Sequence, residues 1–446
     1  MAGSMSFRKR FKWLITALLL LGLSVAFFED LATWCTDSMN QEVLADPGSW
    51  GKMLSGPASH IRVSTVHTST QIGENGCESK RPNLILTAIS GVEWQDQLVI
   101  FLNSLEASLG RETLLASQQH TCPPAPVHVK ITVPGAIAKD LPKGFQEIVR
   151  RFPFVDFVGP DENVHGQWAP LVFWRFGAWA ALLGHAGDPQ SLAVKYDKAL
   201  VIDLDSVFQR NPFDMPLKHG SSLAYFAEWT GLRIGQCKYH LRWFDECEKA
   251  KGGPYITQQQ IDDLGDFERI CAGSVYGTAK AMSVYLQTMA MTLLDSHFRC
   301  NDQALHIHLF YSGLMSHKFK DAGVGSLWLV PNNESLLGTV GTTPIVRFNV
   351  WGEMLNDVGD VQTVIHQYKH HPRLRDLVEK KYGEVVDVGR TDIPDMPTMQ
   401  RELDSIGLTR PRWVMNATSE FCEGFPRAMC SCAKDSCQVG YNDYWY

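Results

Sequence analysis

The chain has 446 residues, and its 41 Lys and Arg against 48 Asp and Glu give a formal net charge of −7. Apolar residues make up 45% of the chain and charged residues 20%. These values are ordinary for globular proteins, and they exclude a mostly disordered, collagenous or polytopic membrane protein. The mild acidity and the absence of a long basic tract argue against nucleic acid as the main partner.

The N-terminal end combines a basic segment, residues 1–12, with an uncharged apolar run, residues 13–28. At 1.5 Å per residue this run spans roughly 24 Å, which is short against a bilayer core of about 30 Å. It predicts either an uncleaved signal anchor with residues 1–12 in the cytosol, or a signal peptide cleaved near Ser24 and Ala26. We favour the anchor, because the thinner membranes of the early secretory pathway suit a short span. Both interpretations place the rest of the chain in the secretory lumen.

The eleven cysteines agree with an oxidising lumen, where several of them can pair. Cys237 and Cys247 flank an expected loop and are predicted to form a disulfide. A second group near the C-terminus is predicted to contain at least one internal disulfide, since no His lies nearby to complete a metal site. This group consists of Cys422, Cys430, Cys432 and Cys437. Two triplets for N-glycosylation begin at Asn333 and Asn416.

The rest of the chain divides into three parts. Residues 29–80 contain Pro-Gly turns and a polar run without apolar periodicity, so they are predicted to be a stem. Residues 81–382 are predicted to form the main domain, and residues 383–446 a loop-rich, Cys-rich appendage. In the main domain, strand-like segments alternate with helix-like ones, which predicts an α/β fold with a mostly parallel sheet. The strand-like segments are 83–89, 127–133, 154–158 and 198–202, and the helix-like segments are 94–109 and 171–183.

An acidic pair, Asp203 and Asp205, directly follows the apolar strand 198–202. Two positions apart in an extended chain, both side chains point the same way. Ligands of such sheets bind beyond the carboxyl ends of the strands. Two carboxylates in a cleft repel each other unless a cation lies between them, and Mn²⁺ or Mg²⁺ is the natural partner. The alternative is a turn with two solvated carboxylates.

The segment Asp197–Asp214 (DKALVIDLDSVFQRNPFD) resembles nucleotide-sugar glycosyltransferases of the GT-A fold, in which an Asp-x-Asp motif closes a central strand. Further segments in the same order support this resemblance over residues 83–380. They are the Glu228–Trp243 region, Cys271–Thr278, Asn301-Asp302-Gln303 and Val364–Pro372. Cys271-Ala272 and Lys369 depart from the family pattern. The resemblance implies a GT-A-like mixed sheet flanked by helices, a Mn²⁺ or Mg²⁺ ion, and a nucleotide-sugar donor.

The resemblance also implies roles for individual residues. Asp205 is expected to bind the ion directly, and Asp203 to bind it through water or to hold the ribose of the donor. His366 is expected as the third ligand, with His370 and His371 as rivals. Asp302 is expected near the reacting sugar, and the alternative for it is a helix cap.

Four further residues are expected to contact the substrates. Gln303 and Gly273 are expected to face the donor sugar, and Arg175 the donor diphosphate. Glu228 is expected to contact the acceptor or act as a base, and the alternative is an ion pair with Arg233.

Three functions compete. The leading one is a metal-dependent glycosyltransferase, anchored in the Golgi membrane as a single-pass type II protein, that transfers a sugar to a glycan or glycoprotein acceptor. Secretion after signal cleavage is the alternative location. The second is a catalytically inactive lumenal domain of the same fold that binds a glycan or a partner. The third is a secreted metal-dependent hydrolase, which would need more His and Asp ligands at short spacing.

Overall fold

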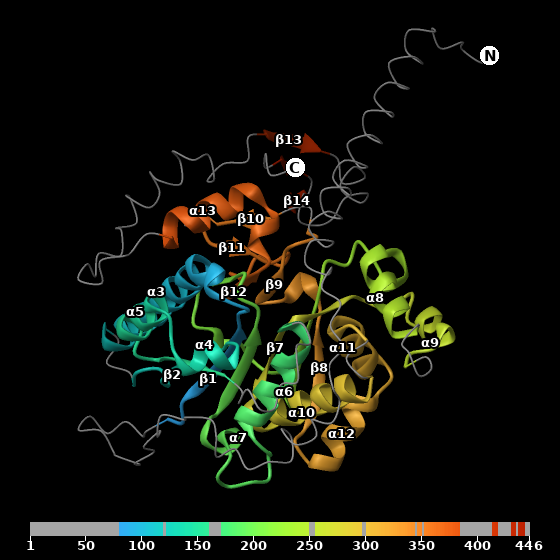
Figure 1. The fold of residues 1–446 in the computed structure, drawn as a ribbon. Helices are drawn as coiled ribbons and strands as arrows, with labels where there is room; N and C mark the ends of the chain where they lie inside the picture. Colours follow the sequence, from blue (N-terminus) through green and yellow to red (C-terminus); the bar gives the residue numbers. More distant parts are fainter. Residues whose placement is uncertain are drawn as a thin grey trace, which may run out of the picture. The chain divides into compact units, whose positions relative to one another are not determined.

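The computed structural model describes residues 80–118, 122–159, 171–248, 255–296, 300–343, 346–349 and 352–383. It also describes the backbone of residues 413–417, 430–433 and 436–441. All of these belong to the compact unit Asp46–Tyr446. Figure 1 shows their elements.

A seven-stranded sheet in the order β3-β2-β1-β4-β7-β6-β8 forms the centre of the fold. Four of its six strand pairs are parallel, and β7 runs antiparallel to both of its neighbours. The prediction of a mixed, mostly parallel sheet is therefore confirmed. The strands are β1 (Asn83–Ala88), β2 (Val127–Thr132), β3 (Val155–Val158), β4 (Lys198–Ile202), β6 (Ser221–Ala227), β7 (Ile270–Thr278) and β8 (Ser326–Val330).

Helices cover both faces of this sheet (Figure 1), because buried strands alternate apolar side chains between the two faces. Along β4, Ala199 and Val201 join one apolar cluster, and Leu200 and Ile202 join the other. The first cluster includes residues of α6 (Leu171–Leu183), α7 (Leu192–Lys195), α8 (Lys238–Glu248), α9 (Gln258–Asp263), α10 (Ala279–Asp295), α11 (Asp302–Tyr311) and α12 (Leu314–Ala322). The second includes residues of α3 (Gln95–Gln118), α4 (Gly135–Lys139) and α5 (Lys143–Arg151).

A second sheet has three strands in the order β5-β12-β9. Its first strand, β5, directly follows the acidic pair in the chain. Its strands are β5 (Ser206–Phe208), β9 (Leu337–Thr339) and β12 (Val364–His366). β12 pairs antiparallel with β5 and parallel with β9, so that His366 lies opposite both Ser206 and Thr339. Because β5 begins directly after Asp205, this pairing carries His366 from far along the chain to the acidic pair.

The remaining elements are short or lie near the C-terminus. The 3₁₀ turns are η2 (Val92–Trp94), η4 (Pro212–Asp214), η5 (Ile234–Gln236), η6 (Asn332–Glu334) and η7 (Tyr368–His370). The others are the hairpin β10 (Arg347–Phe348) and β11 (Met354–Leu355), the helix α13 (Pro372–Tyr382), and a sheet of β13 (Trp413–Ala417), β14 (Cys430–Ala433) and β15 (Ser436–Tyr441).

The predicted elements of the main domain are observed, with shifted boundaries. The predicted helix 94–109 continues to Gln118, because residues 110–118 contain no proline and Arg111 is anchored by an ion pair with Glu353 at 2.8 Å. Within the described residues, no helix is long and apolar enough to cross a bilayer. The predicted anchor, residues 13–28, and the stem before Lys80 lie outside the described residues.

The predicted disulfide between Cys237 and Cys247 is wrong. Cys247 is bonded to Cys300, and Cys237 is a buried free thiol. The expected loop is the helix α8, which starts directly after Cys237, and ten residues of helix separate two ends by about 15 Å, too far for a disulfide. In the C-terminal group, Cys432 lies opposite Cys437 in the pairing of β14 with β15, but the cysteine side chains lie outside the described residues.

Two buried histidines make the fold sensitive to acid. His306 accepts or donates a hydrogen bond with the Tyr285 hydroxyl at 2.9 Å, and His240 lies beside Cys237. Burial, and secondarily a nearby guanidinium, lowers the pKa of each histidine to about 3. In the unfolded chain the pKa of a histidine is about 6.5, so between these values the unfolded state binds more protons. The free energy of unfolding therefore decreases as the pH falls below about 6.5.

We expect each of these histidines to contribute a slope of up to about 1.4 kcal/mol per pH unit. Urea unfolding at pH 4.5–6 measures this slope. We expect His306→Phe to lower it by the contribution of about one proton, about 1.4 kcal/mol per pH unit. His317→Phe, at an exposed position of α12, serves as the control and should leave the slope unchanged. An unaltered slope in His306→Phe would contradict the assignment of a neutral His306.

Candidate metal centre

Asp203 and Asp205 lie just beyond the carboxyl end of β4, where the chain order of the sheet changes direction. β2 and β3 follow one another outward on one side of β1, and β4 lies on its other side. In open α/β sheets, ligands bind at such a switch point. The backbone N–H of Asp203 donates to the carbonyl of Gly273 at 2.9 Å, which fixes the first carboxylate against β7.

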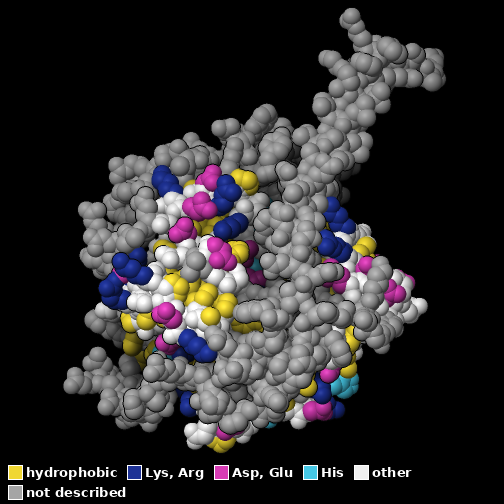
Figure 2. Space-filling model, in the orientation of Figure 1, with side chains coloured by type: hydrophobic (Ala, Val, Ile, Leu, Met, Phe, Trp, Pro, Cys, Tyr) yellow, Lys and Arg dark blue, Asp and Glu magenta, His cyan; other side chains and the backbone are white. Residues whose placement is uncertain are grey.

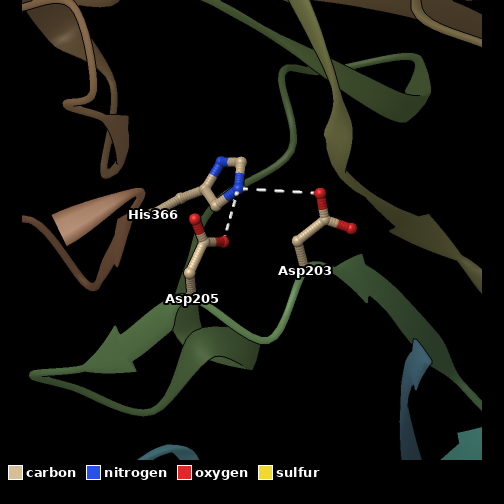
Figure 3. A group of neighbouring side chains, drawn as sticks. All are labelled: Asp203, Asp205 and His366. Carbon is tan, nitrogen blue, oxygen red and sulfur yellow. Dashed lines mark ion pairs between the residues drawn. The ribbon is translucent and has the colours of Figure 1, made fainter. Parts of the chain in front are cut away.

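His366 faces both carboxylates (Figure 3). Its Nε2 lies 3.2 Å from Oδ1 of Asp205 and 3.9 Å from Oδ2 of Asp203. One ligand atom from each of the three residues can be chosen so that all lie within 4.8 Å of one another. Ligand atoms that share one ion with bonds of about 2.1 Å are separated by at most about 4.2 Å, so both distances from Nε2 suit a shared cation.

The chain makes a sharp turn beside this cluster, immediately after His366. The backbone N–H of Gln367 donates to the carbonyl of Asp205 at 2.9 Å. Gln367 has φ 62°, and it is the one non-glycine residue with positive φ among the described residues. A residue other than glycine in this region is strained, and such strain persists where the surrounding structure demands it. The sharp turn thus belongs to the geometry that brings His366 to Asp205.

The residues fit a hard divalent cation. Nε2 of His366 is buried, and it has no hydrogen-bond partner of proper direction in the described part of the chain despite the nearby Asp205 carboxylate. A buried imidazole nitrogen that faces two carboxylates without a well-directed hydrogen bond lies where a shared cation can bind. Carboxylate oxygens and one imidazole nitrogen are suitable ligands for Mn²⁺ or Mg²⁺, and three ligands leave positions for oxygens of a substrate.

The charges of the cluster support one another. Burial disfavours ionisation of Asp205, but His366, with help from His370 and Lys369, holds the pKa of Asp205 below its usual value. Burial by itself would lower the pKa of His366, but Cys271 and Asp205 raise it well above the usual range. Without an ion, a proton on His366 therefore compensates the carboxylate charge.

Gly273 forms a wall of the site. A Cβ at this position would overlap the carboxylate of Asp203 and lie 2.9 Å from Cε1 of His366. Real Cβ atoms essentially never show contacts under 3.0 Å, so a side chain here would displace both ligands. Glycine is thus required by space and not by φ.

We therefore expect Gly273→Ala to weaken the affinity for Mn²⁺ by at least about tenfold, the scale on which disturbed ligand orientation acts. Calorimetric titration of Mn²⁺ is the measurement. Gly110→Ala on α3 is the control, because its Cβ would meet nothing within 4 Å and alanine favours a helix. Equal affinities of the two variants would show that Asp203 and His366 do not need this space.

Arg175 of α6 links the acidic pair to α11. Its two terminal nitrogens contact Asp203 at 2.5 Å and Asp302 at 2.8 Å. Arg175 and Asp302 are both buried, 8% and 5% exposed. Burial, aided by the charge of Asp203, raises the pKa of Asp302 even though Arg175 opposes this. The guanidinium predicted to face the donor diphosphate is thus already bonded to two carboxylates.

Gln303 and the start of α11 hold β7 in place. The side-chain oxygen of Gln303 accepts from the backbone N–H of Ala272 at 2.8 Å, and its amide nitrogen donates to the carbonyl of Ile270. The helix cap is Asn301, whose side chain accepts from the backbone N–H of Gln303 at 2.9 Å. Asp302, for which a cap was the alternative role, is the first residue of the helix.

Glu228 follows β6 and forms an ion pair with Arg269 at 2.9 Å. The alternative pairing with Arg233 is not observed, since Arg233 contacts Glu268 at 3.4 Å. The reason is the antiparallel pairing of β6 with β7, in which the backbone N–H of Glu228 donates to the carbonyl of Arg269. Among the described contacts of Glu228, none is with the acidic pair.

The other histidines have different surroundings. Nε2 of His371 lies 2.7 Å from the carbonyl of Val340, which is its hydrogen-bond partner. His306 and His308 are buried in α11. Sequence reasoning missed Thr339, whose hydroxyl lies 3.3 Å from Nδ1 of His366, and it treated Cys271 only as a departure from a family pattern. Nothing in the local sequence distinguishes this threonine from others.

No protein-family model and no curated protein matches the chain. Solved glycosyltransferase structures are similar to it at low scores. GlyE of Streptococcus pneumoniae TIGR4 is 12% identical over 74% of this chain and 64% of its own, with a TM-score of 0.34. Its apo form is 13% identical over 73% and 64%, with a TM-score of 0.35.

The galactosyltransferase LgtC, solved with donor and acceptor sugar analogs, is 12% identical over 68% of this chain and 98% of its own, with a TM-score of 0.32. This chain thus spans about 64% of the length of GlyE. Scores this low carry no inference about activity, and the geometry of the site has to supply it.

Proposed function

We propose that this protein is a metal-dependent glycosyltransferase, which moves a sugar from a nucleotide-diphosphate donor to a glycan or glycoprotein acceptor. The observation that carries the proposal is the cluster of Asp203, Asp205 and His366 at the switch point of the sheet, with Nε2 of His366 facing both carboxylates. The residues that resemble the Asp-x-Asp motif of nucleotide-sugar enzymes are thus two members of this cluster.

A divalent cation bound here would neutralise the diphosphate of the leaving nucleotide. Asp205 and His366 would be its direct protein ligands, because they approach each other most closely. Asp203 shares its carboxylate between the cluster and Arg175, so we assign it a bond to the ion directly or through water. Preorganised charges of this kind stabilise a transition state without having to reorganise during the reaction.

The residues around the cluster would position the sugar. The bond of Arg175 to Asp203 and Asp302 keeps the two carboxylates at fixed places, and Asp302 is proposed to lie near the reacting sugar. Gln303 would act through the backbone of β7, whose Gly273 is proposed to face the donor sugar. Glu228, held by Arg269, is proposed to face the acceptor.

The sequence also supports a location. We propose a single-pass type II protein of the Golgi membrane, with residues 13–28 as the anchor and the catalytic domain in the lumen. The basic residues before the apolar run favour this orientation. The disulfide between Cys247 and Cys300 agrees with an oxidising compartment.

Release of nucleoside diphosphate tests the activity directly. The full chain is incubated with a panel of nucleotide-diphosphate sugars and Mn²⁺, and we expect at least one donor to be hydrolysed slowly even without an acceptor. A chelator should stop the release, and added Mn²⁺ should restore it. Metal-dependent binding of a donor without any turnover would instead favour the inactive, glycan-binding alternative, and no binding of any donor would refute the proposal.

A further inference from the structure

The far side of the His366 ring meets two polar side chains that have no assigned role. Nδ1 lies 3.3 Å from the hydroxyl oxygen of Thr339 and 3.7 Å from the sulfur of Cys271. All three residues are buried, with His366 0%, Thr339 1% and Cys271 3% exposed. Bulk water therefore does not reach Nδ1, and these two side chains are the polar groups that face it.

Which of them is the partner follows from the chemistry of the ring. A neutral imidazole has one N–H and one lone pair, and the lone pair binds a metal ion. If Nε2 faces the ion, Nδ1 carries the hydrogen and needs an acceptor. A hydroxyl oxygen accepts a hydrogen bond well, whereas thiol sulfur accepts one only weakly. The oxygen of Thr339 is also the nearer atom.

The fold holds Thr339 firmly in this position. β9 and β12 are parallel neighbours with Thr339 opposite His366, and the backbone N–H of Val340 donates to the carbonyl of His366 at 3.0 Å. His371 returns to the same segment through its 2.7 Å contact with the carbonyl of Val340. The hydroxyl and the ring thus belong to one hydrogen-bonded unit, and the orientation of the ring does not depend on a flexible loop.

We propose that Thr339 is a positioning residue of the metal centre: its hydroxyl accepts the Nδ1–H of His366 and so presents the lone pair of Nε2 to the cation. The inference rests on the proposed metal-dependent function, and it adds a residue that no motif contains. Outer partners of this kind fix the tautomer and the orientation of a metal-binding histidine, and their loss typically costs about 10–100-fold in metal affinity.

The test measures binding of Mn²⁺ alone to the full chain, by the electron paramagnetic resonance signal of free Mn²⁺. Thr339→Val keeps the shape and removes the hydroxyl, and we expect about 10–100-fold weaker binding. Thr339→Ser keeps the hydroxyl and should recover most of the affinity. Thr339→Ala is the second hydroxyl-free variant, for use if valine disturbs the fold, and urea unfolding identifies the variants that remain folded. Cys271→Ala removes the rival partner beside the same nitrogen, and it should not weaken the binding of Mn²⁺.

The outcomes separate this inference from the proposed function. Loss of affinity in Thr339→Val with recovery in Thr339→Ser supports the assignment. If the unmodified protein binds Mn²⁺ through Asp205 and folded Thr339→Val or Thr339→Ala binds it equally well, the inference fails and the function stands. Loss of affinity in Cys271→Ala alone would make the thiol the partner and overturn the assignment. If the unmodified protein binds no Mn²⁺, or Asp205→Ala binds it unchanged, the proposed metal centre itself is wrong.

Discussion

The Asp205→Asn variant is expected to lose nucleotide-sugar hydrolysis and transfer by about 100–1,000-fold, the usual cost of removing one preorganised electrostatic interaction. The amide preserves the shape of the side chain but removes the charge that faces Nε2 of His366 at 3.2 Å. The side chain of Asp205 is 25% exposed and lies outside the apolar clusters, so the fold should persist. Calorimetric titration of a donor at increasing Mn²⁺ measures the loss of metal-dependent binding.

The matched control for this variant is Asp321→Asn, the same change on the exposed face of α12. It should retain the full rate and the full dependence on Mn²⁺. If Asp205→Asn bound the donor with unchanged affinity and unchanged dependence on Mn²⁺, the acidic pair would be only a turn after β4. That result would remove the basis of the proposed function.

Replacement of Arg175 by methionine should have the largest effect on stability. It leaves the Asp302 carboxylate, which is 5% exposed, without its cationic partner and deprives Asp203 of the same charge. Removing one member of a buried ion pair typically destabilises a protein by about 3–5 kcal/mol, because the other charge stays buried and unpaired. Urea unfolding gives the value, and we expect Arg175→Met to lower the midpoint strongly.

A second substitution distinguishes the unpaired charge from lost packing. Arg175→Met combined with Asp302→Asn removes the buried carboxylate as well, and it should recover a large part of the lost stability. Arg175→Lys keeps the charge but loses the two-pronged contact, and it should fall between the unmodified protein and Arg175→Met. A free energy of unfolding in Arg175→Met within about 1 kcal/mol of the original would contradict the structural role, since typical surface changes remain within that range.

The parts of the site that were predictable from the sequence are those encoded locally. The apolar run before Asp203 and Asp205 predicts a buried strand that ends in two carboxylates, and β4 confirms it. The third member of the cluster was predictable only from resemblance. Whether His366, His370 or His371 turns inward depends on the register of β12 against β5, which no local pattern shows.

The wrong disulfide and the unforeseen partners of Arg175 have a common physical origin. The pairing of Cys237 with Cys247 assumed a loop where the chain forms α8, and the actual partner, Cys300, is 53 residues away from Cys247. Arg175 was predicted to face the donor diphosphate, and the structure pairs its guanidinium with two carboxylates that the sequence did not indicate as its partners. In each case the decisive contact is set by tertiary packing. On the face drawn in Figure 2, acidic and basic side chains lie intermingled.

The pairing of β5 with β12 makes the proposed metal centre a link between distant parts of the chain. Asp205 and His366 are 161 positions apart (366 − 205), so their contact closes a long loop whose entropic cost opposes folding. An ion that binds only the closed arrangement returns free energy to the folded state, about 2.7 kcal/mol at a concentration 100-fold above its dissociation constant. A chain that ends before residue 364 lacks β12 and the third ligand, so this binding free energy cannot stabilise it. Removal of the cation would then lower the free energy of unfolding, apart from any effect on the catalytic rate.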